Sequence, residues 1–224
     1  MKTSFKTFDE LVRCYESVCS AMKQQELLHC RVVMDSDDFT DAERAEILLM
    51  GGHQWRLANR NNAAHRAAAI ETLTNAALWK KAYQDFEELY ATVEKTISQQ
   101  HQIGPLACYD VAMRIGHCIG CNPERMVYLQ SGALKGGMAL LGTKAPGRMV
   151  ATETFQAFFS GLSALDIEDL LCIMKAHFKK GGVNPDVEGN FRVGNCYRWT
   201  CSPELRDKIK RHLEATHTEC YVKL

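Results

Sequence analysis

Two cysteines and two histidines near the C-terminus have the order and the outer spacing of a zinc-binding sequence. The pattern is C-x4-C-x10-H-x4-H, formed by Cys196, Cys201, His212 and His217. Thiolate sulfur and neutral imidazole nitrogen are ligands that tetrahedral zinc prefers. The central spacing is about two residues shorter than in a zinc finger of this type, and cysteines of reduced proteins are commonly small buried hydrophobic residues. We therefore expect no metal and no other cofactor, and a zinc site at these four residues is the alternative.

A second group combines aromatic rings with side-chain amides, the features of a pocket that holds a nucleobase. A base that leaves a duplex needs ring surfaces to stack on and amides that read its edge. The pocket residues that we expect are Trp55, Asn59, Tyr109, Tyr128 and Gln130. A helix cap beside a core tryptophan is the alternative for residues 53–65.

The elements that position these side chains meet at a short turn between two amphipathic stretches. Apolar residues recur every three or four positions in residues 83–100, which predicts a helix with one apolar face. The turn is expected to require Gly104, and Pro105 fits the first turn of a following helix that ends near Gly116. Such a turn leaves backbone N–H groups at the positive end of a helix, where phosphate is the natural ligand.

This turn resembles the helix-hairpin-helix of DNA-repair proteins, whose hairpin carries an apolar-Gly-apolar-Gly pattern followed by a small residue. Ile103, Gly104 and Cys108 match that pattern, and Gln102 stands in place of the first glycine. The resemblance extends over residues 85–141 and implies double-stranded DNA as the partner. The residues that we assign to DNA contact are Gln102, Ile103, Gly104, Leu106, Ala107, Lys135, Lys179, Lys180 and Arg198. A plain helical corner that touches no DNA is the alternative.

The resemblance also directs attention to a catalytic carboxylate. In DNA glycosylases with this hairpin, an aspartate beyond the hairpin stabilises the sugar cation, and some members add a lysine that forms a Schiff base. The matching region, residues 126–131, has no aspartate, and the lysine position falls near Leu106. Asp110 is our first candidate because the positive helix end would keep it ionised, and Glu124 is the second. The structural alternatives are an exposed i,i+4 pair of Asp110 with Arg114 and an ordinary first-turn glutamate at Glu124.

Helices dominate the elements that we expect, and capping residues mark where they begin. Capping boxes start at Thr7 and Thr40, and Asp166 and Ser202 are expected as N-caps. Residues 122–129 suit either a helix start or a short extended piece. The expected helices cover residues 7–28, 40–49, 63–83, 83–100, 105–116, 166–178 and 202–217.

The sequence thus predicts a mainly α, compact multi-helix protein containing a helix-hairpin-helix, with a small irregular or β-containing C-terminal segment. Residues 183–200, which are rich in Gly, Asn and aromatic side chains, form that segment. We expect an N-terminal helical lobe at residues 1–82, a helix-hairpin-helix core at 83–181 and a basic segment at 182–224. One compact domain that includes all three is the alternative.

Composition and charge limit the class of protein. With 224 residues and 46% hydrophobic content, the chain can bury a substantial core. Ten cysteines at irregular spacing without an export signal favour free thiols, and no apolar run approaches the roughly 20 residues of a membrane span. We therefore expect a cytoplasmic protein outside the membrane.

The zero net charge hides a gradient along the chain. Residues 1–50 carry six basic and ten acidic side chains, whereas residues 171–224 carry ten basic and six acidic ones. The C-terminal cations, Lys208 among them, are expected to follow phosphates. Ordinary solvated faces are the alternative.

The combined expectation is a monofunctional DNA glycosylase that extrudes a damaged or modified base and hydrolyses its N-glycosidic bond. Because the usual aspartate position is empty, an unusual base such as a bulky modified pyrimidine of foreign DNA is the expected substrate. The alternatives are a non-enzymatic helix-hairpin-helix DNA-binding or adaptor protein and a helical protein-interaction module. Neutral net charge favours the last of these.

Overall fold

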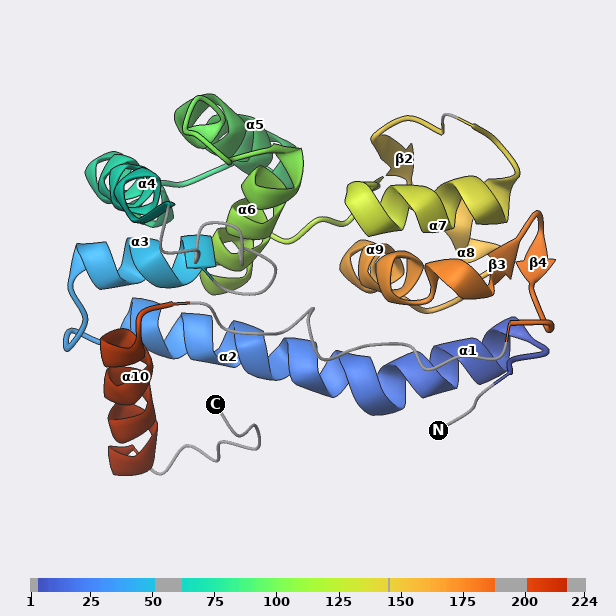
Figure 1. Ribbon diagram of the computed structural model, residues 1–224, viewed down its shortest axis with the longest axis horizontal. Coiled ribbons are helices and arrows are strands. Elements are labelled where there is room, and N and C mark those ends of the chain that lie inside the picture. Colours follow the sequence, from blue (N-terminus) through green and yellow to red (C-terminus); the bar gives the residue numbers. More distant parts are fainter. Residues whose placement is uncertain (1–3, 51–61, 145, 188–200, 217–224) are drawn as a thin grey trace. The chain divides into compact units, whose positions relative to one another are not determined.

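The protein is mainly helical. The computed structural model describes residues 4–50, 62–144, 146–187 and 201–216 of the chain (Figure 1). Within these ranges the strands form two small antiparallel sheets of two strands each. The predicted class, a mainly α multi-helix protein, is confirmed. In the described part of the chain, no helix is both long enough and apolar enough to cross a membrane.

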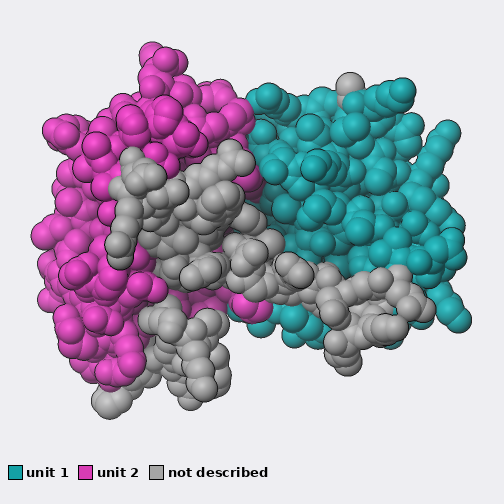
Figure 2. All heavy atoms as spheres, viewed as in Figure 1, with its two compact units in different colours: residues 1–21, 123–193 teal, residues 22–122, 194–224 magenta. Residues whose placement is uncertain are grey.

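The chain divides into two compact units, each assembled from two stretches that are far apart in sequence (Figure 2). Unit 1 contains Met1–Ala21 and Pro123–Val193, and unit 2 contains Met22–Asn122 and Gly194–Leu224. The three predicted segments are each continuous, and their boundaries at residues 82 and 181 differ from those of the two units.

Unit 1 is built around a close helix pair. Its elements are α1 (Phe8–Tyr15), β1 (Met126–Tyr128), α7 (Ser131–Leu141), β2 (Met149–Ala151), α8 (Glu153–Gln156), α9 (Ala164–Ile173), β3 (Phe178–Lys179) and β4 (Gly182–Val183). Helix α7 packs on α9 through glycines. A Cβ at Gly136 would lie 2.2 Å from the carbonyl oxygen of Leu171, so no larger residue fits there. Strand β1 pairs with β2, and β3 pairs with β4.

Unit 2 holds the predicted hairpin. Its elements are α2 (Ala21–Asp35, from Met22 on), α3 (Asp41–Met50), α4 (Ala63–Ala76), α5 (Phe86–Ile97), α6 (Pro105–Ile119) and α10 (Pro203–Ala215). Helix α5 packs against α6, and α3 packs against both α4 and α6. The hairpin helices therefore rest on the other helices of the same unit.

Side-chain hydrogen bonds cap the starts of five described helices, α1, α3, α5, α9 and α10. The Thr40 hydroxyl accepts from the Glu43 amide at 3.2 Å, and the Glu43 carboxylate accepts from the Thr40 amide at 2.8 Å. This is a complete capping box. At α1 the box is shifted, because Glu10 accepts from the Lys6 amide instead of the Thr7 amide.

Several predicted helix boundaries are wrong. The N-cap of α9 is Ser163, whose hydroxyl accepts from the Asp166 amide at 3.1 Å, so Asp166 lies in the first turn. The helix ends at Ile173, and β3 follows because the chain turns back at Gly181, whose φ is 66°. The helix from Thr7 was expected to end at residue 28, but helical residues continue through a π turn (Glu16–Ser20) to Asp35.

The alanine-rich helix is shorter than the expected 63–83, and residues 122–129 adopt one of their two expected forms. The alanine-rich helix stops at Ala76, because Ala77 takes a left-handed conformation with φ 43° and ends the hydrogen bonding. Residues 126–128 form strand β1, so the extended piece expected there is confirmed and the helix start is wrong.

Candidate nucleic-acid interface

The predicted pair of helices is present, and its turn is short. Phe86, Leu89, Val93 and Ile97 bury one face of α5 against α6. Gly104 is the N-cap of α6, and Pro105 is its first residue, as expected. The turn closes through a 3.1 Å hydrogen bond from the Ile103 amide to the Gln100 carbonyl.

The first turn of α6 offers backbone donors. Among the described residues, none accepts a hydrogen bond from the amides of Gly104, Leu106 or Ala107. The first helical hydrogen bond is that of the Cys108 amide to the Gly104 carbonyl at 3.1 Å. No acidic side chain lies in this first turn. The helix end therefore keeps its positive partial charge available to an anion.

The space beside Gly104 is open. Its backbone is extended, with φ −105° and ψ −179°, a conformation that any residue adopts. A Cβ at this position would have no described heavy atom within 4 Å. The expectation that the turn requires Gly104 is therefore wrong. Because Gly104 has no side chain, a ligand has room to approach the amides.

Backbone strain lies instead at Gln102, the position where the resemblance has glycine. Its φ is 67°, in the left-handed region that glycine favours. Its amide nitrogen Nε2 lies 3.0 Å from Nε2 of His101. A second bond, from Gln100 Nε2 to the Thr72 hydroxyl at 3.1 Å, fastens the turn to α4.

The predicted contact residues of the turn differ in exposure. Gln102 is exposed, and Gly104 and Leu106 are partly exposed, whereas Ile103 and Ala107 are 6% and 4% exposed. Only the backbone of the last two can face a ligand. Because the Ile103 amide already donates within the turn, it is the least suited of the five to bind phosphate.

Two histidines that sequence reasoning did not select for DNA contact meet at the hairpin. The ring of His65, in the first turn of α4, lies 4.1 Å from the ring of His101, with 38° between their planes. Both side chains are exposed. No local pattern marks this pair, because His65 lies on α4 and His101 lies in the turn after α5, and the two segments meet only in the folded unit.

Asp110 is buried in a charged cluster. It is 6% exposed, and Arg114, one turn further along α6, is 1% exposed. Arg114 donates to Glu26 of α2 through Nε at 2.9 Å and Nη2 at 2.8 Å, and to the Leu48 carbonyl of α3 through Nη1 at 2.9 Å. The alternative of an exposed Asp110–Arg114 pair is wrong.

Charge compensation maintains this cluster. Burial alone would lower the pKa of Arg114, but the negative charges of Glu26 and Asp110 outweigh burial and raise it. Sequence reasoning missed Glu26. A sequence signal was available, because Glu26 stands at helical spacing from Lys23 and Cys30. All three residues are buried on α2.

The remaining pocket and catalytic candidates are divided between the two units. Tyr109 is buried in unit 2, while Tyr128 and Gln130 are buried in unit 1. Glu124 is exposed before β1, and its carbonyl oxygen accepts from the Thr152 hydroxyl at 2.8 Å. Trp55, Asn59 and Arg198 lie outside the described residues.

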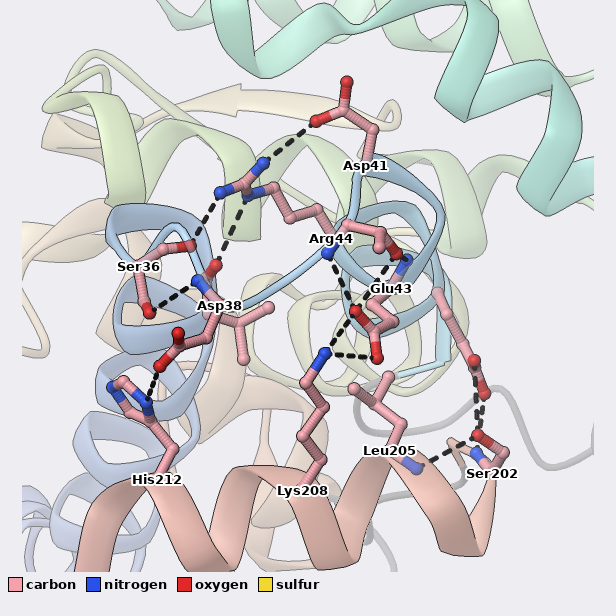
Figure 3. Close-up of polar contacts among 12 residues, drawn as sticks. Ser36, Asp38, Asp41, Glu43, Arg44, Ser202, Leu205, Lys208 and His212 are labelled. Carbon is pink, nitrogen blue, oxygen red and sulfur yellow. Dashed lines mark hydrogen bonds and ion pairs between the residues drawn. The ribbon is translucent and has the colours of Figure 1, made fainter. Parts of the chain in front are cut away.

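The basic candidates fall into two groups. Lys135, Lys179 and Lys180 are exposed on unit 1. Lys208 on α10 is used inside unit 2, since its Nζ lies 2.8 Å from both carboxylate oxygens of Glu43 (Figure 3). Partial burial raises the pKa of Glu43, but the hydrogen bonds from Lys208 and Thr40 outweigh burial and lower it. The expectation that Lys208 follows phosphates is therefore wrong.

His212, one residue of the zinc pattern, helps to attach α10 to the rest of unit 2. His212 Nδ1 lies 3.0 Å from Asp38, and Ser202, the confirmed N-cap of α10, donates its amide to Glu46 at 2.6 Å. Cys201 is buried, and burial raises its pKa to about 12. Cys196 and His217 lie outside the described residues. In the part of the chain that is described, no three His, Cys, Asp or Glu side chains form a group that could hold a metal.

Comparison of the chain with protein-family models, with curated proteins and with solved structures gives no match. The functional assignment therefore depends on the residues and geometry of the hairpin.

Proposed function

We propose that the protein binds double-stranded DNA, with the turn between α5 and α6 holding a backbone phosphate. The observation that carries this proposal is that no described residue accepts a hydrogen bond from the amides of Gly104, Leu106 and Ala107, and that the space beside Gly104 is open. Amides at a helix N-terminus match the charge and the acceptor geometry of a phosphate group. Phosphate contacts of this kind position a protein on a duplex without reading its sequence.

Residues 101–107 contain no Lys or Arg, and this limits the affinity for DNA that we expect from the turn. Non-specific DNA binding typically has dissociation constants of about 10⁻⁴ to 10⁻⁶ M. Each phosphate that a Lys or Arg neutralises adds a slope of about −1 to a plot of log affinity against log salt concentration, and a contact made by neutral amides adds less. We expect weak, sequence-independent and shallowly salt-dependent binding from the turn alone.

Substitution at Gly104 tests this proposal. Alanine and then valine should fold normally, because the backbone is ordinary and the space is empty, but should keep a phosphate away from the amides. Hydrogen bonds to a charged group contribute about 1.5–3 kcal/mol, so duplex affinity should fall roughly tenfold to a hundredfold.

Leu106→Ala is the matched control, since it removes a side chain and keeps the amide. Fluorescence anisotropy with a labelled duplex at low salt measures all four proteins. Equal affinity of Gly104→Val and the unchanged chain would remove the turn from the interface. Absence of any salt-sensitive duplex binding would favour the protein-interaction module instead.

A second candidate function is hydrolysis of an N-glycosidic bond in the bound DNA. The observation that favours it is the position of Asp110, one turn beyond Ala107 on the same side of α6. Asp110 is buried beside Arg114, so this candidate function requires that bound DNA reach its carboxylate, which would then stabilise positive charge on a sugar. The substrate would be a damaged or modified base, such as a bulky modified pyrimidine of foreign DNA. Abasic sites revealed by alkali, across a broad panel of modified duplexes, are the test.

A further inference from the structure

Six exposed cations of unit 1 lie on and around helix α7. Residues 131–151 and 170–187 include α7, β2, β3, β4 and the 3-10 turn η5 (Lys175–His177). These two stretches contain six Lys and Arg but one acidic residue, Asp186, although the whole chain has net charge zero. We call the six exposed cations the α7 basic surface: Lys135, Lys144, Arg148, Lys175, Lys179 and Lys180.

Backbone and packing contacts distribute these cations along the helix. Lys135 lies on α7 itself. The Leu129 amide donates to the Arg148 carbonyl at 2.7 Å, two residues before the helix begins. At the other end, a Cβ at Gly142 would lie 2.5 Å from the Lys180 side chain, so that side chain covers the last turn. Because η5 and β3 also pack against α7, the surface borders one helix within one unit.

None of the six cations forms an ion pair with a described residue. Their charged groups make one hydrogen bond within the described ranges, from Lys175 Nζ to the Cys172 carbonyl at 2.9 Å. In unit 2, by contrast, Arg44, Lys80 and Lys208 each pair with an acidic side chain. The positive charge around α7 is therefore not neutralised by the described part of the protein.

The acidic residues of the neighbouring helix α9 do not compensate this charge. Asp166 and Asp169 lie 3.1 and 3.0 Å from the Tyr15 hydroxyl, so both carboxylates face α1. Glu168 is 8% exposed. Three exposed acidic residues remain in the described residues 123–187, and they lie before β1, on α8 and after β4: Glu124, Glu153 and Asp186.

We infer that the α7 basic surface binds the phosphates of duplex DNA and supplies most of the electrostatic affinity. This inference deepens the proposed function and rests on it for the identity of the partner. Unpaired cations attract a polyanion and release its counterions, which neutral amides of a turn do far less. A lipid surface fits less well, because peripheral membrane binding needs several inserted apolar side chains. Among the described residues 123–187, Met149 is the only exposed large hydrophobic one.

The salt dependence of duplex binding, measured by fluorescence anisotropy, tests this inference. Each neutralised phosphate adds a slope of about −0.9, so six contacts give about −5 in a plot of log affinity against log salt concentration. Affinity should then fall roughly a thousandfold between about 50 mM and 200 mM salt. The triple variant Lys135→Gln/Lys144→Gln/Lys179→Gln should make the slope shallower by about 3. Its unfolding midpoint in urea should not change, because these side chains form no ion pair with a described residue.

The matched control is Lys6→Gln/Lys81→Gln/Lys210→Gln, which removes three exposed lysines of other elements. It should keep the steep slope. A slope near zero in the unchanged chain, or an equal change in both triple variants, would overturn the α7 basic surface and leave the turn as the DNA contact.

The variant Gly104→Val separates this inference from the proposed function. A steep slope that the first triple variant loses and Gly104→Val leaves intact, with unchanged affinity in Gly104→Val, would support the α7 basic surface and remove the turn from the interface. Absence of duplex binding would overturn both. In that case, binding to phosphatidylserine vesicles that the first triple variant loses would assign the surface to lipid instead.

Discussion

Replacement of Arg114 by methionine should destabilise unit 2 more than any exposed charge change. Arg114 joins three helices, because it lies on α6, binds Glu26 of α2 and donates to the last turn of α3 at the Leu48 carbonyl. Its side chain is 2% exposed, and that of Glu26 is 5% exposed. Methionine fills similar space but leaves a buried carboxylate and a buried carbonyl without the cation.

The expected loss of stability follows from the burial of Arg114 and Glu26. Removal of one partner of a buried ion pair costs about 3–5 kcal/mol, since the remaining charge is uncompensated. The whole stability of a domain is about 5–15 kcal/mol. At roughly 2–4 °C per kcal/mol for a chain of this size, the midpoint of thermal unfolding should fall by on the order of 10 °C.

Calorimetry and urea unfolding measure this loss, and hydrogen exchange locates it in α2, α3 and α6. The two-unit division means that the transitions of the units need not coincide. Lys80→Met is the matched control, because it removes a cation that is 55% exposed and pairs with Asp41, and pairs of this kind contribute at most about 1 kcal/mol. The reasoning is refuted if Arg114→Met costs no more than Lys80→Met. Double variants with Glu26→Gln should show a coupling energy above about 1 kcal/mol.

Three further predictions concern stability and chemistry. Burial lowers the pKa of His29 from 6.5 to about 4. Below pH 6.5 the unfolded chain binds a proton that the folded chain excludes, so stability should fall by about 3 kcal/mol between pH 6.5 and pH 4, and unfolding of His29→Leu should lack that part of the slope. Gln102→Gly should stabilise the protein by about 0.5–1 kcal/mol, because it relieves a left-handed backbone; a lower unfolding midpoint in urea would contradict this. If the protein excises bases, Asp110→Asn should reduce abasic-site formation at least about a hundredfold while duplex affinity stays within about twofold; full activity would shift attention to Glu124.

Helix starts were predictable where the signal is a hydrogen bond between residues three positions apart. The reciprocal bonds of Thr40 and Glu43 need only their own turn, and the prediction there is confirmed. At α9, two polar residues three positions apart compete for the N-cap, and the hydroxyl of Ser163 takes it while Asp166 accepts from that hydroxyl. Sequence alone does not decide which of two suitable residues has the extended backbone of a cap.

The interior of unit 2 was not predictable in the same way. The partner of Arg114 is Glu26, 88 positions away, and a local rule placed Asp110 and Arg114 on the surface instead. The same limit applies to His65 and His101. Spacing rules describe one helix at a time, whereas these contacts arise where separate helices pack.

The two ends of α6 explain how its first turn can be both open and rigid. Arg114 fixes the helix to α2 and α3 in the interior, while Gly104 leaves the amides at the other end uncovered. A rigid donor group loses little conformational entropy when it binds an anion. Stability and phosphate binding should therefore separate by position: Gly104→Val should lower duplex affinity with little change in unfolding free energy. Arg114→Met should lower unfolding free energy and leave affinity nearly unchanged while unit 2 stays folded. A parallel loss of both properties in both variants would mean that the turn and the buried cluster form one cooperative element.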